Sequence, residues 1–244
     1  MARRLTEAWR RARSAAGPGT LPETPSRVST HETAPRPRSL RALRVAVEAC
    51  RACPLWRGAT HGVAGEGKTT ARVVLVGEQP GDREDLSGKP FVGPAGMLLD
   101  RALEAAGIDR DAVFVTNVVK HFKWVPRGKR RIHKTPAQRE VAACLDWLVA
   151  ELRLVRPMLV VCLGATAARA LIGRDFKVSE RRGELVTGTR WAPGVLATVH
   201  PSSILRLIGH DERAAAFARL VADLRRVHDV LRAPRTTRAA LPAP

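Results

Sequence analysis

Four short apolar segments that alternate with helical patterns constrain the fold of this chain most. The predicted strands are RVVLVG (72–77), AVFVTNVV (112–119), MLVVCLG (158–164) and GVLATVHPSS (194–203). The predicted helices cover 94–107, 135–155, 165–173 and 211–231. Apolar strands separated by helices are typical of a mostly parallel sheet that is covered on both faces. The sequence therefore predicts an α/β fold with three layers, αβα, around a central, mostly parallel four-stranded sheet.

One domain is predicted, over residues 40–231, and it opens with a short amphipathic helix, LRALRVAVEAC (40–50). Residues 1–39 are basic, rich in Pro and Arg and without periodicity, which predicts a disordered extension. Residues 232–244 are predicted to be a disordered tail. Since no run of about 18 apolar residues exists, no membrane span is expected. The N-terminus lacks the apolar segment of a secretory signal, so we expect a cytoplasmic, nucleoid-associated bacterial protein.

The chain is strongly basic, with 42 Lys and Arg against 23 Asp and Glu, a formal net charge of +19. Such a charge indicates a polyanion as partner, with nucleic acid first and an acidic membrane second. The charge is concentrated between Lys120 and Lys134, a segment that contains seven Lys or Arg and no acid. Its last part, GKRRIHK (128–134), is predicted to be a loop that contacts phosphates, and it places His133 inside the cationic cluster.

Polar side chains follow the first predicted strand, in GEQPGDREDLSGKPFVGPAG (77–96). Ligands of parallel α/β sheets bind beyond the carboxyl ends of the strands. The glycines, beginning with Gly77, let the backbone approach a ligand closely, although a long structured turn would explain them as well. Glu78, Gln79 and Asp82 offer carboxylate and amide groups at one rim, and Phe91 offers a stacking face.

Two later strand ends carry further candidates. The amide of Asn117 can donate and accept together, which reading a pyrimidine edge requires, although an Asn at a strand end is more often a turn former. In HPSS (200–203), Pro201 ends the strand and Ser202 or Ser203 can cap the next turn. His200 would then point into the crevice beyond the sheet. Together, the three strand ends predict a ligand site.

The four cysteines are Cys50, Cys53, Cys144 and Cys162. Without an export signal, metal binding is expected rather than disulfides. A Cys-x2-Cys pair with two separate cysteines suits tetrahedral zinc or a [4Fe–4S] cluster, and the missing second Cys-x2-Cys pair favours the cluster. Alternatively, Cys162 in VVCLG is a buried apolar residue.

GEQPGD, KPFVGPAG, the Thr-Asn at a strand end, the cysteine pattern and HPSS together resemble the family 4 uracil-DNA glycosylases, which carry an iron–sulfur cluster. The resemblance spans about residues 45–230. Gln79 stands where the family more often has a small residue, and ordinary members lack GKRRIH. Both features are similar to the branch called UdgX, which excises uracil and becomes covalently attached to the DNA.

The resemblance implies a role for each candidate. Phe91 would stack on the flipped uracil, Asn117 would bind its edge and His200 would polarise its O2. Glu78, Gln79 and Asp82 would line the sugar side. The remaining assignments are substrate contacts by Gly77, Ser202, Arg130 and Arg131, and ligation of a [4Fe–4S] cluster by Cys50, Cys53, Cys144 and Cys162. Arg130 and Arg131 would clamp phosphate or buttress the loop.

His133 is the predicted nucleophile that traps the oxocarbenium at C1′. The surrounding Lys and Arg favour its neutral form, and Glu78 would orient its ring. Two alternatives remain: an ordinary glycosylase with turnover, in which GKRRIH only grips the backbone, and a non-catalytic iron–sulfur protein that binds single strands through charge. The expected partner is uracil-containing DNA, preferably single-stranded, and the expected state is a monomer.

Overall fold

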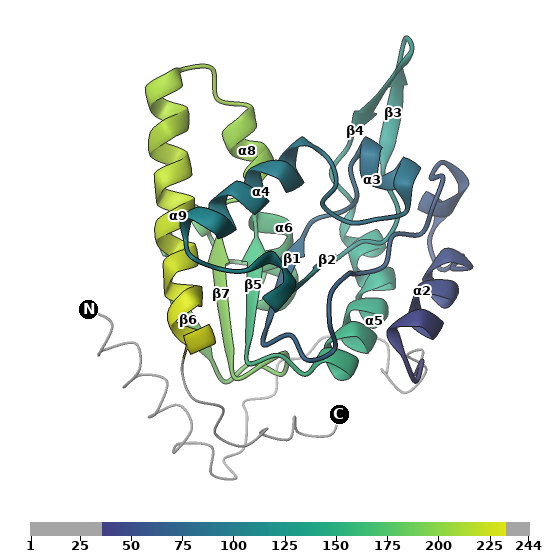
Figure 1. Cartoon of the computed structure of the whole chain (residues 1–244). Helices are drawn as coiled ribbons and strands as arrows, with labels where there is room; N and C mark the ends of the chain where they lie inside the picture. The colour runs from purple at the N-terminus through teal and green to yellow at the C-terminus, as the bar shows by residue number, and fades with distance from the viewer. Residues whose placement is uncertain (1–35, 233–244) are drawn as a thin grey trace.

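A five-stranded sheet in the order β2-β1-β5-β7-β6 forms the centre of the computed structural model, which describes residues 36–232 (Figure 1). Its strands are β1 (Val73–Gly77), β2 (Val113–Asn117), β5 (Leu159–Leu163), β6 (Leu185–Thr187) and β7 (Gly194–Thr198). All neighbours are parallel except β6, which is antiparallel to β7. The mostly parallel sheet is confirmed, and the count of four strands is wrong because β6 has only three residues and lies at an edge, where no long apolar run is needed.

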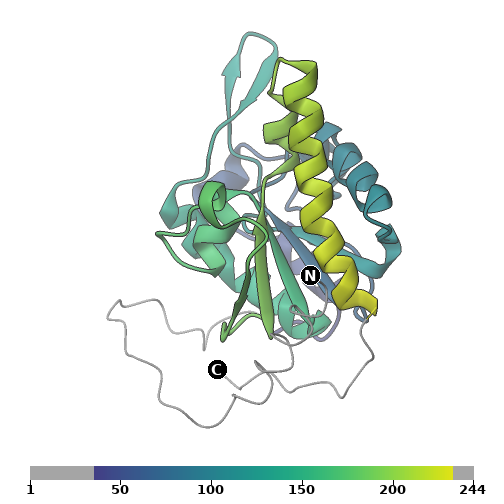
Figure 2. The ribbon, with the colours of Figure 1, turned by 90° about the vertical axis from the view of Figure 1, so that its left-hand side faces the viewer.

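Helices cover both faces of the sheet, which confirms the three layers (Figures 1 and 2). The helices are α2 (Leu40–Glu48), α3 (Asp82–Ser87), α4 (Pro94–Ala105), α5 (Gln138–Val155), α6 (Ala165–Leu171), α7 (Val178–Arg181), α8 (Pro201–Leu205) and α9 (His210–Arg232), with 3-10 turns at Pro54–Arg57 and Arg110–Ala112. One hydrophobic cluster joins α2, α5 and α6 to the sheet. The other joins α4, α8 and α9 to the opposite face.

The strands are apolar throughout because alternate side chains enter the two clusters. On β1, Val74 and Val76 belong to the α5 side, whereas Val73 and Leu75 belong to the α4 side. All four are fully buried, and each such side chain stabilises the fold by roughly 1.5–3 kcal/mol. The strand ends that carry polar residues are therefore held by a rigid, doubly packed sheet.

The basic segment is a β-hairpin and not the loop that the sequence predicted. Strands β3 (Trp124–Arg127) and β4 (Arg130–His133) pair antiparallel, with Trp124 opposite His133. The hairpin projects beyond the body of the fold (Figure 1). Gly128 has a φ of +58° at its tip. The prediction failed because, among the described residues, these strands pair only with each other, so no buried face imposes an alternation of apolar and charged residues.

Two helix starts also differ from the prediction. The helix predicted from residue 135 begins later, because Ala137 is the N-cap of α5. The carboxylate of Glu140 accepts a hydrogen bond from the Ala137 N–H at 2.6 Å. α8 is capped by the ring of His200 rather than by Ser202 or Ser203. The predicted extension (1–39) and tail (232–244) lie outside the described residues, apart from 36–39 and Arg232. No helix in the described part of the chain is long and apolar enough to cross a membrane.

Candidate active site

A cleft of about 620 Å³ opens beyond the carboxyl ends of the parallel strands. Its walls come from residues at or after these ends: Glu78 and Gln79 after β1, Asn117 on β2, Gly164 after β5 and His200 after β7. The carboxyl ends of parallel strands meet at one edge of a sheet, which is why residues far apart in the sequence share this cleft.

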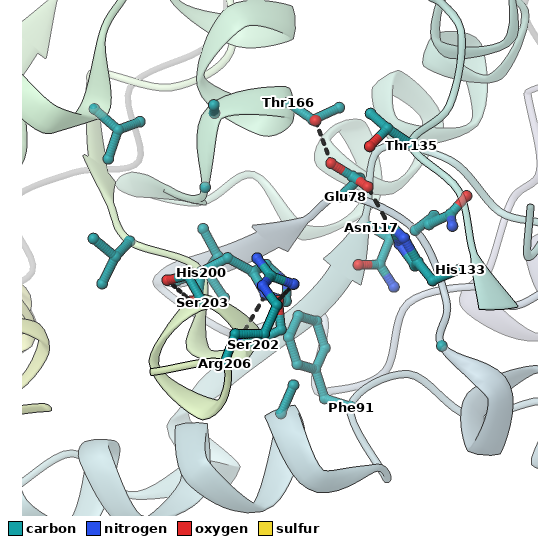
Figure 3. Close-up of a pocket in the computed structure, with 18 of the residues that line it drawn as sticks. Glu78, Phe91, Asn117, His133, Thr135, Thr166, His200, Ser202, Ser203 and Arg206 are labelled. Carbon is teal, nitrogen blue, oxygen red and sulfur yellow. Dashed lines mark hydrogen bonds and ion pairs between the residues drawn. The ribbon is translucent and has the colours of Figure 1, made fainter. Parts of the chain in front are cut away.

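Glu78 lies between two partners from different elements (Figure 3). His133 Nε2, at the end of β4, is 3.3 Å from Glu78 Oε1. The Thr166 hydroxyl, on α6, donates a hydrogen bond to Glu78 Oε2. Burial by itself would raise the pKa of Glu78, but the interactions with His133 and Thr166 outweigh it and hold that pKa below its ordinary value. The cleft therefore contains an ionised carboxylate next to an imidazole.

His200 presents a neutral imidazole to the same cleft. Burial, as the largest cause, lowers the pKa of His200 to about 4, and the opposing effect of Glu78 does not offset it. Its Nδ1 accepts a hydrogen bond from the Ser202 N–H at 3.1 Å, with the Ser202 hydroxyl at 2.8 Å. Because Nδ1 accepts, the ring proton sits on Nε2, which faces into the cleft. His200 can therefore donate a hydrogen bond to a bound group.

Phe91 and Asn117 are buried around Gly77 at the deep end of the cleft. Phe91 has a φ of +59°, which turns its ring toward His200, with ring centroids 6.3 Å apart and planes at 29°. A Cβ atom on Gly77 would lie 2.3 Å from Asn117 Oδ1 and 2.8 Å from Phe91 Cζ. Gly77 is thus required for the aromatic face and the amide to lie side by side, where a planar base would fit.

Gln79 joins the two ends of the hairpin segment. Its side-chain oxygen accepts a hydrogen bond from the Lys123 N–H at 3.1 Å. Its amide nitrogen donates to the carbonyls of Lys123 and Lys134, at 3.2 and 3.1 Å. Gln79 borders the cleft, but its polar atoms are engaged with the chain on either side of the hairpin. The structure thus shows Gln79 fixing the base of the hairpin that carries His133.

Arg131 anchors the same hairpin to α3. Its guanidinium pairs with Asp82 through Nε at 2.5 Å and with Asp85 through Nη1 at 2.6 Å. The guanidinium also lies over the rings of Phe122 and Trp124, 5.5 and 5.6 Å from their centroids. Asp82 does not line the cleft, so the structure places Asp82 and Arg131 together as an anchor, away from the cleft walls.

The side of the hairpin that faces solvent remains strongly basic. Arg130, which the sequence predicts to contact substrate, is exposed to solvent, whereas Arg131 is half-buried. The other exposed cations of the segment are Arg127, Lys129 and Lys134. These four charges are available to a polyanion beside the cleft.

Three of the four cysteines gather between α2 and α5. Burial, as the largest cause, raises the pKa of the Cys144 thiol to about 12, and neighbouring Cys53 and Cys50 raise it further. The Lys120 N–H donates a hydrogen bond to Cys144 Sγ at 3.1 Å, and Trp147 Nε1 donates to Cys50 Sγ at 3.2 Å. Sulfurs that accept N–H bonds in a closed pocket are the setting in which thiolates hold an iron–sulfur cluster.

Cys162 does not belong to this group. It lies on the central strand β5, between Val76 of β1 and Ala197 of β7, and is fully buried. Burial alone raises the pKa of its thiol, without a contribution from another cysteine. The structure therefore corresponds to the apolar alternative for Cys162.

His121 is a buried residue that the sequence reasoning missed. Its Nδ1 has no hydrogen-bond partner within the part of the chain that the structure describes. Burial, as the largest cause, lowers its pKa, and Arg51, which adjoins Cys50, lowers it further. His121 directly follows Lys120, whose N–H donates a hydrogen bond to Cys144 Sγ, so the backbone of His121 adjoins the cysteine group.

The donor set suits a cluster better than a single ion. Among residues 36–232, no group of three or more His, Cys, Asp or Glu side chains is spaced to hold one metal ion. A cubane cluster takes one ligand per iron, so its ligands stand farther apart than those of one zinc ion. Three thiols and an unpaired imidazole nitrogen would supply four donors, the number that such a cluster takes.

The model of the uracil DNA glycosylase superfamily matches residues 64–225, which include every part of the cleft. The chain belongs to this superfamily. Within it, a relative from Thermotoga maritima named type-4 uracil-DNA glycosylase is 40% identical over 163 residues, 66% of this chain and 80% of the relative. Relatives of the same name from Archaeoglobus fulgidus and Pyrobaculum aerophilum are 38% and 36% identical, over 65% and 68% of this chain and 79% and 85% of their own lengths.

In this superfamily member, the sequence located the cleft but missed three features of the site. Thr166 gives no signal in the sequence, since a Thr in the first turn of a helix is ordinary. For Arg131, buttressing the loop was one of the two expected roles, but its pairing with Asp82 was not expected, because their contact joins α3 to a hairpin that was not predicted. The sequence signal for His121 was a His two residues after the second predicted strand, at the start of the basic segment.

Proposed function

We propose that this protein excises uracil from DNA and then captures the deoxyribose through His133. The observation that carries the proposal is the pairing of His133 with Glu78, inside the cleft that also contains Asn117 and His200. A glycosylase that used water alone would have no need for an imidazole held against the carboxylate.

Base recognition comes first. A flipped uracil would stack on Phe91, and its edge would meet the amide of Asn117, which can donate to a carbonyl and accept from an N–H. Gly77 keeps the space between these side chains free of a Cβ. The same hydrogen-bond pattern rejects cytosine, whose edge presents an amino group and an unprotonated N3 instead.

Bond cleavage follows. As the C1′–N1 bond breaks, its electron pair leaves with uracil, and negative charge develops on O2. The Nε2–H of neutral His200 can donate to that oxygen, which stabilises the leaving group. The ionised Glu78 faces the positive charge that develops on the sugar.

Capture completes the reaction without a water molecule. The lone pair of one His133 ring nitrogen forms the new bond to C1′, while the proton on the other ring nitrogen is held toward Glu78. The ring becomes a cation that the carboxylate stabilises, and no oxidant or reductant is needed. Each molecule then acts once.

A denaturing gel tests the proposal. The protein is mixed with a labelled single-stranded oligonucleotide that carries one uracil, beside a thymine control. We expect a uracil-dependent band that survives boiling in detergent and is absent with His133→Ala. His210→Ala is the matched control, because this histidine is exposed on α9 and should leave the band unchanged.

Two other outcomes correspond to the alternatives. Strand cleavage by alkali without the stable band would mean ordinary excision with turnover. Absence of both would leave a DNA-binding protein only. Covalent capture by a His133→Ala protein would refute the role of this residue.

We further propose that a [4Fe–4S] cluster is held by Cys50, Cys53 and Cys144, with His121 as the fourth ligand in place of Cys162. The cluster would brace α2 and the turn after β2 and take no part in the bond changes. Iron content and visible absorbance of the purified protein test this assignment. We expect His121→Ala to lose iron and Cys162→Ser to retain it, and the reverse result would restore the original set of four cysteines.

A further inference from the structure

A fully buried lysine–carboxylate pair lies directly behind the cleft. Lys120 and Glu151 have no exposed side-chain surface, and Lys120 Nζ is 2.7 Å from Glu151 Oε2. Such pairs seldom stabilise a fold more than apolar side chains of the same volume would, because desolvation offsets the attraction. A contribution to stability therefore does not explain why this pair is buried here.

Every proton of the Lys120 ammonium has a partner. Besides Glu151, Nζ donates to the Thr116 hydroxyl and to the Asn117 carbonyl, each at 2.7 Å. Glu151 accepts from the Thr116 hydroxyl at 2.7 Å and from the Gly65 N–H at 2.8 Å. The network is closed, so it holds the end of β2 in one position.

The contact with the Asn117 carbonyl supplies a hydrogen bond that a neighbouring strand would normally provide. β2 is an edge strand of the central sheet. On its outer side, Val115 exchanges both backbone hydrogen bonds with Glu66 in an isolated bridge. Asn117, two residues later, presents its carbonyl to the same side, beyond that bridge. Lys120 supplies the donor that a neighbouring strand would otherwise provide.

The turn after Asn117 also reaches the catalytic carboxylate. The N–H groups of Val118 and Val119 donate to the carbonyls of Gly77 and Glu78, both at 3.0 Å. The position of Lys120 thus fixes Asn117 directly and the backbone of Glu78 through the same turn.

We propose that Lys120 and Glu151 are positioning residues for uracil recognition: the buried pair sets the orientation of Asn117 and so the fit of the base. The inference rests on the proposed uracil excision. It requires that losing the pair reduces uracil binding and the excision rate even when the fold is intact.

The test compares wild type with Lys120→Met and with the double variant Lys120→Met/Glu151→Leu. The single variant leaves a buried carboxylate unpaired and is expected to lower the melting temperature, whereas the double variant removes both charges and should restore it. Asp223→Asn is the matched control, since Asp223 is a buried carboxylate on α9 that bonds Thr198 and Arg182 on the opposite side of the sheet.

Five quantities are measured for each protein: the melting temperature, the iron content, the affinity for free uracil, the affinity for a thymine-containing strand and the single-turnover excision rate at saturating DNA. Displacement of a reacting group by about 1 Å costs on the order of 100-fold in rate. We therefore expect the folded double variant to bind free uracil more weakly and to excise roughly 100-fold more slowly, with unchanged affinity for a thymine-containing strand. Asp223→Asn should change only the melting temperature.

The proposal is overturned if the double variant matches wild type in uracil affinity and excision rate, which would make the pair merely structural. It is also overturned if Asp223→Asn loses as much excision activity as the double variant, since general instability would then explain the loss. The same holds if the loss of excision activity parallels a loss of iron, since the cluster would then be the cause. Failure of wild type to release uracil would refute the proposed function instead, and that result is visible in the same assay.

Discussion

Replacing Asp85 by Asn should weaken covalent capture much more than uracil excision. The Asp85 side chain is fully buried. Its Oδ2 accepts a hydrogen bond from Arg131 Nη1 at 2.6 Å, and its Oδ1 accepts one from the Thr60 N–H at 2.9 Å. Arg131 lies two residues before His133 on β4. Loss of the Asp85 carboxylate therefore releases the strand that carries the proposed nucleophile, while the proposed base pocket around Asn117 remains.

The magnitude follows from the two carboxylates that share the Arg131 guanidinium. Removing one partner of a buried ion pair costs roughly 3–5 kcal/mol, and we take the lower value because Asp82 still pairs with Arg131. About 3 kcal/mol corresponds to roughly a 100-fold lower capture rate. The Asp82 side chain is 50% exposed, and an exposed ion pair contributes about 0–1 kcal/mol, so Asp82→Asn should reduce capture less than about fivefold.

The assay is a quenched time course with a uracil-containing single strand, in which released uracil and the detergent-stable band are quantified from the same samples. Asp82→Asn is the matched control, because it removes the other carboxylate from the same guanidinium. The reasoning would be refuted if the two variants lost capture equally, or if Asp85→Asn lost excision in proportion to capture.

Three further predictions test other parts of the site. The free energy of unfolding should fall as the pH drops from about 6.5 to about 4, because the unfolded chain binds a proton at His200 that the folded chain, with its lowered pKa, does not bind; urea titrations of wild type and His200→Gln would show whether this contribution disappears. Gly77→Ala should reduce excision on the order of 100-fold with the far-UV circular dichroism unchanged, since the added Cβ would collide with Asn117 and Phe91 and displace groups that contact the base; normal activity would show that the base does not bind there. Neutralising the exposed hairpin cations Arg127, Lys129 and Arg130 together should reduce the slope of log affinity against log salt for single-stranded DNA by about 2, and an unchanged slope would move the DNA path elsewhere.

The proposed covalent step and the proposed base recognition depend on different parts of the fold. Within residues 36–232, the strand that carries His133 pairs only with β3, so the position of His133 depends on the side-chain contacts of Gln79 and Arg131 rather than on the central sheet. The proposed base pocket, by contrast, is built on strand ends that are buried on both faces. We therefore expect changes in the hairpin to affect capture and changes in the sheet to affect excision.

The sequence by itself determined the layered fold and the position of the cleft. Continuous apolar runs such as 72–77 and 158–164 can only be buried on both faces, and parallel strands necessarily bring their carboxyl ends to one edge. Glu78, Asn117 and His200 were found for that reason, since each ends or follows such a run. Local pattern and topology were sufficient for these residues.

Only the tertiary structure decided which polar residues meet. The basic segment has no buried face, so its pattern did not reveal a hairpin, and the pairing of Arg131 with Asp85 joins residues that no periodicity connects. The apolar run around Cys162 left both cluster ligation and simple burial open, and only the fold shows that Cys162 is fixed in the sheet core whereas Cys144 lies beside two thiols. The physical reason is that apolar burial follows a local repeat, whereas a charge or a thiol is specified by a partner distant in the chain, and that partner is known only when the chain has folded.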